Sequence, residues 1–70
     1  MTGQVECRAS DRYPSRPLAL HWQGERLAIA RLQAEWQAPG ARHFRVETED
    51  GQWFELIYSE VKDEWTIDQA

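Results

Sequence analysis

Apolar and polar residues alternate on both sides of a turn signal in the stretch from residue 43 to residue 59. The apolar positions are Phe44 and Val46 before the turn, and Phe54, Leu56 and Tyr58 after it. This alternation predicts two strands that each bury one face. A three-residue loop at 49–51 places Val46 opposite Phe54 and Phe44 opposite Leu56, whereas a two-residue loop puts the apolar sets on opposite faces. We therefore expect a β-hairpin in which Gly51 closes the loop with a positive φ.

A second hairpin is predicted around Gln23-Gly24. Leu18 and Leu20 lie at alternate positions before this turn. A two-residue turn places Leu20 opposite Leu27 and Leu18 opposite Ile29, so apolar positions match across the two strands again.

The segment 25–37 is ambiguous between strand and helix. Its content of Ala, Leu, Arg, Glu and Gln favours a helix, and Ile29, Leu32 and Trp36 follow helical spacing. The alternation matched by the preceding turn favours a strand instead, with a β-bulge between Ile29 and Leu32 to change the buried face. We expect a long, bulged strand, and keep a helix within 28–37 as the alternative.

Strands are also expected at the two ends of the chain. Val5, Cys7 and Ala9 alternate in the first, and Trp65 and Ile67 alternate in the last. Five or six short strands predict a single all-β domain over residues 1–70, a small antiparallel barrel or sandwich. The expected core comprises Leu20, Leu27, Ile29, Phe44, Val46, Phe54, Leu56 and Trp65.

Charge is distributed unevenly along the 70 residues, whose formal net charge is −4. Residues 1–45 contain seven arginines and four acidic residues, while residues 46–70 contain eight acidic residues and Lys62 as the one cation. Basic and acidic strands can pair and cancel their charges locally, or the two halves can form a bipolar binding surface.

The remaining composition points to a cytoplasmic monomer. A single cysteine excludes an intrachain disulfide and suits a reducing compartment. No apolar run approaches the roughly 18 residues of a membrane span, so we expect no membrane association.

The chain resembles a family of short, uncharacterised bacterial β-domains, some of which are encoded with, or fused behind, translesion-type DNA polymerases. The resemblance covers roughly residues 13–67 and implies an all-β fold without an assigned activity. The positions that carry it are Tyr13-Pro14, Pro17, Leu20-His21-Trp22, Gly24, Leu27-Ala28-Ile29, Trp36, Phe44-Arg45-Val46, Asp50-Gly51, Phe54-Glu55-Leu56, Tyr58 and Trp65.

The chain carries no recognisable catalytic, cofactor-binding or metal-binding signature. Cys7 is expected to be a small core residue, since a nucleophilic thiolate needs a nearby base or cation. His21 and His43 lack the spacing of zinc ligands, and the acidic residues lack that of a calcium loop. We therefore expect a noncatalytic domain without cofactor or metal.

The second face of the hairpin at 43–59 is the candidate partner-binding site. Arg45 is expected opposite Glu55, and Trp53 and Ile57 share their face. An apolar centre flanked by charges is typical of protein-interaction surfaces. The opposing interpretation is that the N-terminal strand or the 25–37 segment covers this face.

Binding of single-stranded nucleic acid is the alternative function. Small β-barrels bind single strands by stacking bases on exposed aromatic side chains, and Trp22, Trp36 and Trp53 could serve in that role beside the seven arginines. The acidic net charge disfavours this alternative, because it weakens attraction to a phosphate backbone.

Overall fold

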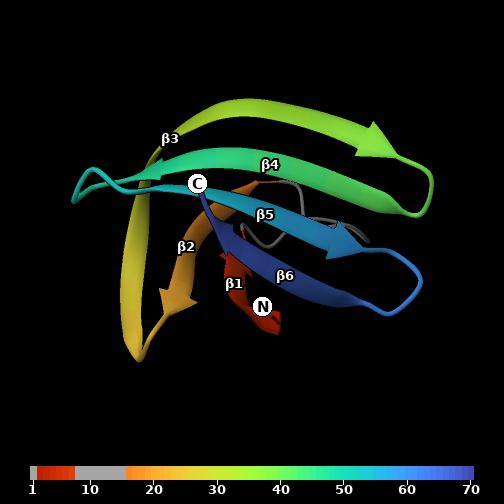
Figure 1. Ribbon diagram of the computed structural model, residues 1–70, viewed down its shortest axis with the longest axis horizontal. Coiled ribbons are helices and arrows are strands. Elements are labelled where there is room, and N and C mark those ends of the chain that lie inside the picture. Colours follow the sequence, from red (N-terminus) through yellow and green to blue (C-terminus); the bar gives the residue numbers. More distant parts are fainter. Residues whose placement is uncertain (1, 8–15) are drawn as a thin grey trace.

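Six antiparallel strands close into a barrel in chain order in the computed structural model, which describes residues 2–7 and 16–70 (Figure 1). Each strand pairs with the next, and β1 also pairs with β6. The predicted all-β, antiparallel barrel is therefore confirmed, and the alternative of a helix within 28–37 is wrong. The strands are β1 (Thr2–Cys7), β2 (Pro17–Trp22), β3 (Glu25–Ala38), β4 (Ala41–Thr48), β5 (Trp53–Ser59) and β6 (Glu64–Gln69).

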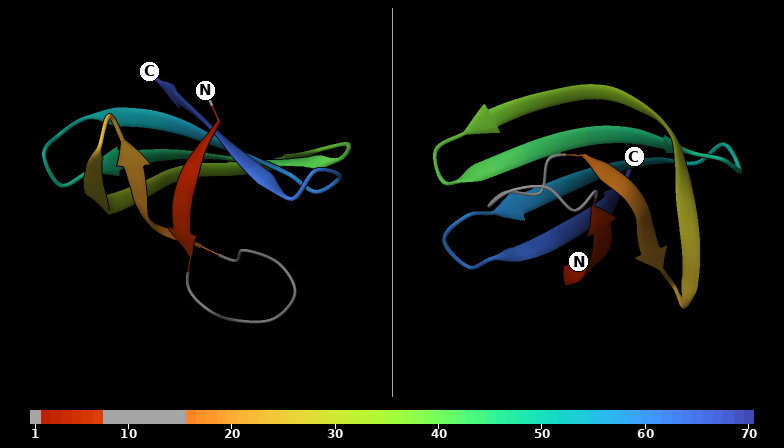
Figure 2. Two further views of the ribbon diagram at one scale, coloured as in Figure 1. Left: turned by 90° about the horizontal axis from the view of Figure 1, so that it is seen from below. Right: turned by 180° about the vertical axis from the view of Figure 1, so that it is seen from behind.

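β3 is long enough to belong to two parts of the barrel wall. Its first residues pair with β2 as far as Ala28, and its remainder, from Ile29 onward, pairs with β4. Between these parts the strand bends sharply, so that β4, β5 and β6 run side by side with its second part while β1 and β2 cross them (Figure 2). The register with β4 shifts between Ile29 and Arg31 and again between Leu32 and Ala34. The predicted bulge is thus confirmed, and tertiary pairing overrides the helical propensity of the segment.

The predicted register of the hairpin at 43–59 is confirmed, and that of the hairpin around Gln23-Gly24 is confirmed at Leu20 and Leu27. Val46 pairs with Phe54 and Phe44 with Leu56. Gly51 has a φ of 86°, as its place at the end of a three-residue loop requires. Leu20 pairs with Leu27 around the turn at Gln23 and Gly24, whose φ values of 52° and 81° are those of a type I′ turn.

The core forms where the two parts of the barrel wall face each other. Ile29 and Trp65 from the predicted core are partly buried against it, together with Val5, Trp22 and Leu32. Leu18 departs from the predicted matching, because it is 47% exposed and the pairing of β2 with β3 stops at Ala19 and Ala28. The fully packed cluster comprises Leu20, Leu27, Phe44, Val46, Phe54, Leu56 and Ile67.

β1 closes the barrel through a short junction. It pairs with β6 at only two positions, Thr2 with Thr66 and Gly3 with Trp65, while its later residues pair with β2. Ala9, which was expected to continue this strand, lies outside the described residues.

Candidate partner-binding face on β3, β4 and β5

The residues on the outer side of β4 and β5 can be identified from the alternation of buried side chains along these strands. Because Phe44 and Val46 face the core, His43, Arg45 and Glu47 face outward on β4. The same alternation turns Trp53, Glu55 and Ile57 outward on β5. On β3, Trp36 pairs with His43 and Ala34 with Arg45, which brings both β3 residues to this side. We call Trp36, His43, Arg45, Trp53, Glu55 and Ile57 the outer aromatic face.

All four predicted site residues lie together on this face. Arg45 pairs directly with Glu55, and its Nη2 lies 3.8 Å from Glu55 Oε1. This is the expected cross-strand ion pair, and its length and exposure make it a weak one. Trp53 and Ile57 flank Glu55 along β5, and both are half-buried. The structure therefore assembles the apolar residues and the charges into one surface.

Trp36 joins this face from outside the hairpin at 43–59, and the candidate site predicted from the sequence did not include it. Its indole stacks on the His43 imidazole with ring centroids 5.2 Å apart and planes inclined by 11°. The Arg45 guanidinium carbon lies 6.0 Å from the centroid of the same indole. Trp36 nevertheless remains 40% exposed. A two-residue turn at Pro39-Gly40 could have placed Trp36 opposite His43 from the sequence alone.

His43 joins the aromatic and charged parts of the face. Its ring lies under the Trp36 indole, and its Nδ1 atom is buried 3.5 Å from Glu55 Oε2, with no hydrogen-bond partner. Ile57 is its neighbour on β5. Trp36, His43 and Ile57 thus form one row across three strands, and Arg45 and Glu55 lie in the next row.

Neither segment that was expected to cover this face lies over it. β3 lies beside β4 in the same sheet, and β1 lies between β2 and β6 in the barrel wall (Figure 1). Trp53 keeps part of its surface exposed, as does Ile57. Within the described part of the chain, the outer aromatic face is therefore open to a partner.

A second polar cluster spans β1, β2 and β3. Glu6 accepts hydrogen bonds from Arg26 Nε at 2.8 Å and Nη2 at 3.1 Å, and its Oε2 lies 2.9 Å from His21 Nε2. These contacts, first that of Arg26 and then that of His21, hold the pKa of Glu6 below its ordinary value. The cluster ties three strands together, and its charged groups are engaged with one another.

The residues considered for chemistry do not assemble into a site. Burial raises the pKa of the half-buried Cys7 thiol, which keeps the thiolate scarce at neutral pH. His21 contacts Glu6, whereas His43 lies under Trp36. Among residues 2–7 and 16–70, no group of three His, Cys, Asp or Glu side chains is placed to hold a metal ion. The same residues contain no helix that is long and apolar enough to cross a membrane.

No family model, no curated protein and no solved structure matches this chain. The resemblance to short bacterial β-domains therefore remains a prediction.

Proposed function

We propose that this domain is a noncatalytic protein-interaction module that binds its partner through the outer aromatic face. The observation that carries the proposal is the Trp36 indole, which is 40% exposed and yet stacked flat on His43. Tryptophan is among the residues most enriched at interface hot spots. An indole that is already held by stacking loses little conformational freedom when a partner covers it, so more of its burial contributes to affinity.

The charges around the indole favour a polypeptide partner over a nucleic acid. Arg31 and Arg45 point outward on this side. Arg31 pairs with Glu47 and Arg45 with Glu55, and Asp68 pairs with Glu55 on the next strand. Three carboxylates among two arginines oppose a phosphate backbone, whose binding depends on a basic groove. A protein surface with charges of both signs around an apolar centre can complement this pattern.

Trp36→Ala tests the proposal in a capture experiment with the immobilised domain. We expect the substitution to weaken partner binding by roughly 30-fold or more, the effect of losing a hot spot of about 2 kcal/mol. The domain should stay folded, because the stacked pair with His43 contributes only about 0.5–1.5 kcal/mol, which corresponds to a decrease of roughly 2–12 °C in the melting temperature.

Val61→Ala is the matched control. Val61 is 86% exposed in the turn between β5 and β6, outside the outer aromatic face, so its truncation removes an exposed apolar side chain without touching the proposed surface. Retention of every captured protein by Trp36→Ala would refute the assignment. Saturable binding of oligo-dT at moderate salt, lost in Trp36→Ala, would instead support the nucleic-acid alternative.

A further inference from the structure

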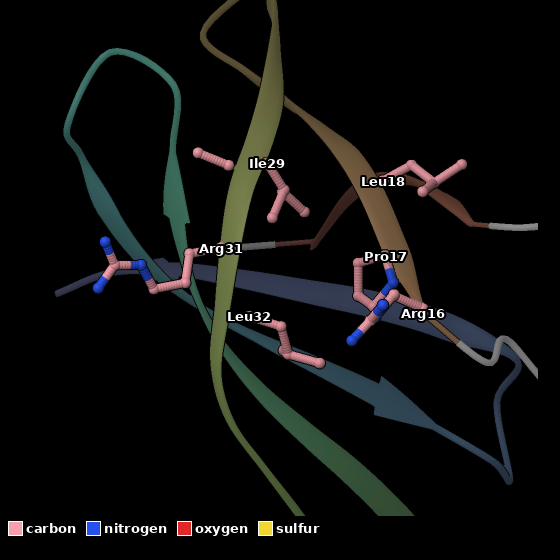
Figure 3. Close-up of a pocket in the computed structure, with 7 residues that line it drawn as sticks. Arg16, Pro17, Leu18, Ile29, Arg31 and Leu32 are labelled. Atoms are coloured by element: carbon pink, nitrogen blue, oxygen red, sulfur yellow. The ribbon is translucent and has the colours of Figure 1, made fainter.

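A groove opens on a different part of the barrel, where β3 leaves β2 to join β4. Its volume is about 460 Å³. Figure 3 shows the side chains of Ile29 and Leu32 pointing into the gap between the two strands, with the Arg16 guanidinium reaching into the same gap. Leu18 points away from the gap, and so does Arg31, which lies on the far side of β3. The groove therefore has an apolar floor with Arg16 reaching over it, and Arg31 projects from the opposite face of β3.

The groove continues into an unpaired strand edge. From Ile29 to Ala38, β3 pairs with β4 along one edge, while its pairing with β2 has already ended at Ala28. Within the described ranges, no strand pairs with the other edge of this part of β3. Such an edge presents backbone N–H and C=O groups at alternate residues. Residues 30–38 include neither proline nor lysine, which proteins commonly use to block an edge.

Both arginines are available to a carboxylate. Arg16 is exposed, and no acidic residue among those described pairs with it. Arg31 is 69% exposed, and its Nε is 3.7 Å from Glu47 Oε1, a long contact that a better acceptor can replace. Because guanidinium groups pair well with carboxylates, the charge next to the groove complements an acidic ligand.

We propose that this groove and the adjoining edge of β3 bind an extended, acidic and apolar segment of another protein, which adds to the sheet as a strand. An apolar side chain of the segment lies on Ile29 and Leu32. Because neighbouring residues of a strand point to opposite faces, the carboxylates next to it meet Arg31 on the other face of β3, and a carboxylate at the end of the segment meets Arg16. Backbone hydrogen bonds along 30–38 supply the rest of the affinity, as in other complexes that form by strand addition. The edge adjoins the outer aromatic face at Trp36, but the groove residues Arg16, Ile29 and Leu32 are not part of that face. Arg16→Glu tests the groove and Trp36→Ala tests the face, so either assignment can fail without the other.

The probe is the peptide fluoresceinyl-Asp-Val-Glu-Leu-Asp-Val-amide, labelled at its N-terminal amine and titrated with the whole domain in 150 mM salt. We expect saturable binding by fluorescence anisotropy, and at least 10-fold weaker binding when lysine replaces every acidic residue of the peptide. Arg16→Glu should weaken binding at least 10-fold. Lys62→Glu is the matched control, since it makes the same change of charge at an exposed turn residue and should leave binding unchanged.

Two further measurements distinguish strand addition from simple charge attraction. In an added strand, every second backbone amide faces β3. N-methylation of these amides should abolish binding, whereas N-methylation of the amides between them should not. Hydrogen exchange should slow at alternate amides within 30–38 when the peptide is bound.

The absence of saturable peptide binding would overturn the proposal, as would equal tolerance of both N-methylated peptides. Equal weakening by Arg16→Glu and Lys62→Glu would also overturn it, since it would show non-specific electrostatics. A domain that dimerises through this edge, with the dimer lost in Arg16→Glu, would assign the groove to a second copy of the chain instead.

Discussion

Gly3→Ala should open the junction that closes the barrel. A Cβ built on Gly3 would lie 2.4 Å from Cδ1 and 3.1 Å from Cγ1 of Ile67. Ile67 is only 1% exposed and is enclosed by the core, so its side chain has little room to move away. β1 pairs with β6 at two positions only, and one of them is Gly3 with Trp65. A single methyl group therefore acts on the weakest junction of the barrel wall.

The expected size of the effect follows from two opposing contributions. Overpacking a core usually costs about 1–3 kcal/mol. Replacing glycine by alanine returns about 0.4–1 kcal/mol, because it restricts the unfolded chain. The free energy of unfolding should therefore fall by about 1–2 kcal/mol. For a domain of this length, that corresponds to a decrease of roughly 5–15 °C in the melting temperature.

A double-mutant cycle with Ile67→Val isolates the contact between these residues. Valine lacks the Cδ1 atom that the new methyl group would strike, and alone it should cost about 0.5–1.5 kcal/mol. In that background Gly3→Ala should cost close to nothing, which gives a coupling energy of about 1–2 kcal/mol. Urea unfolding followed by tryptophan fluorescence measures all four proteins. Strictly additive losses, or an unchanged midpoint for Gly3→Ala, would refute the reasoning.

Two further predictions concern a turn and a carboxylate. Gly51→Val should lower the free energy of unfolding by about 1–2 kcal/mol through backbone strain alone, because φ is 86° and no atom beyond the two adjacent residues lies within 4 Å of the new Cβ. Equal urea midpoints for the two proteins would contradict this. Arg26, and then His21, hold the pKa of Glu6 below its ordinary value in the folded state. The ionised Glu6 side chain therefore stabilises the fold above its unfolded-state pKa, and this stabilisation is lost as the pH falls through the folded-state pKa. In a carboxyl NMR titration Arg26→Gln should raise the pKa of Glu6, and an unchanged titration would exclude Arg26 as the cause.

The hairpins could be predicted because their information is local. Turn length and alternation together fix the register, so residue types alone were enough to pair Val46 with Phe54 and Arg45 with Glu55. Three of the four predicted site residues, Trp53, Glu55 and Ile57, lie on β5, and the register brings Arg45 on β4 beside them. That part of the outer aromatic face therefore follows from the order of residues along a single hairpin.

The remaining features depend on contacts between distant parts of the chain. The approach of Gly3 to Ile67 joins the first strand to the last, and no sequence pattern encodes it. The cluster of Glu6, His21 and Arg26 likewise needs three strands in register. Periodicity can predict which face a residue occupies on its own strand, but it cannot identify which strand lies next to it when the connection is long.

β3 shows why a helix-prone sequence suits this barrel. Its two shifts of register let one strand leave β2 and join β4, and the groove and the unpaired edge follow from that transfer. Outside the bend most residues of β3 are exposed or half-buried. Few of their side chains pack in the core, so residues with low strand propensity are tolerated there. Ala34 lies opposite Arg45, and its short side chain leaves the guanidinium free to reach toward Trp36. Ala34, which favours a helix in isolation, therefore gives the Arg45 side chain room on the outer aromatic face, beside the open strand edge.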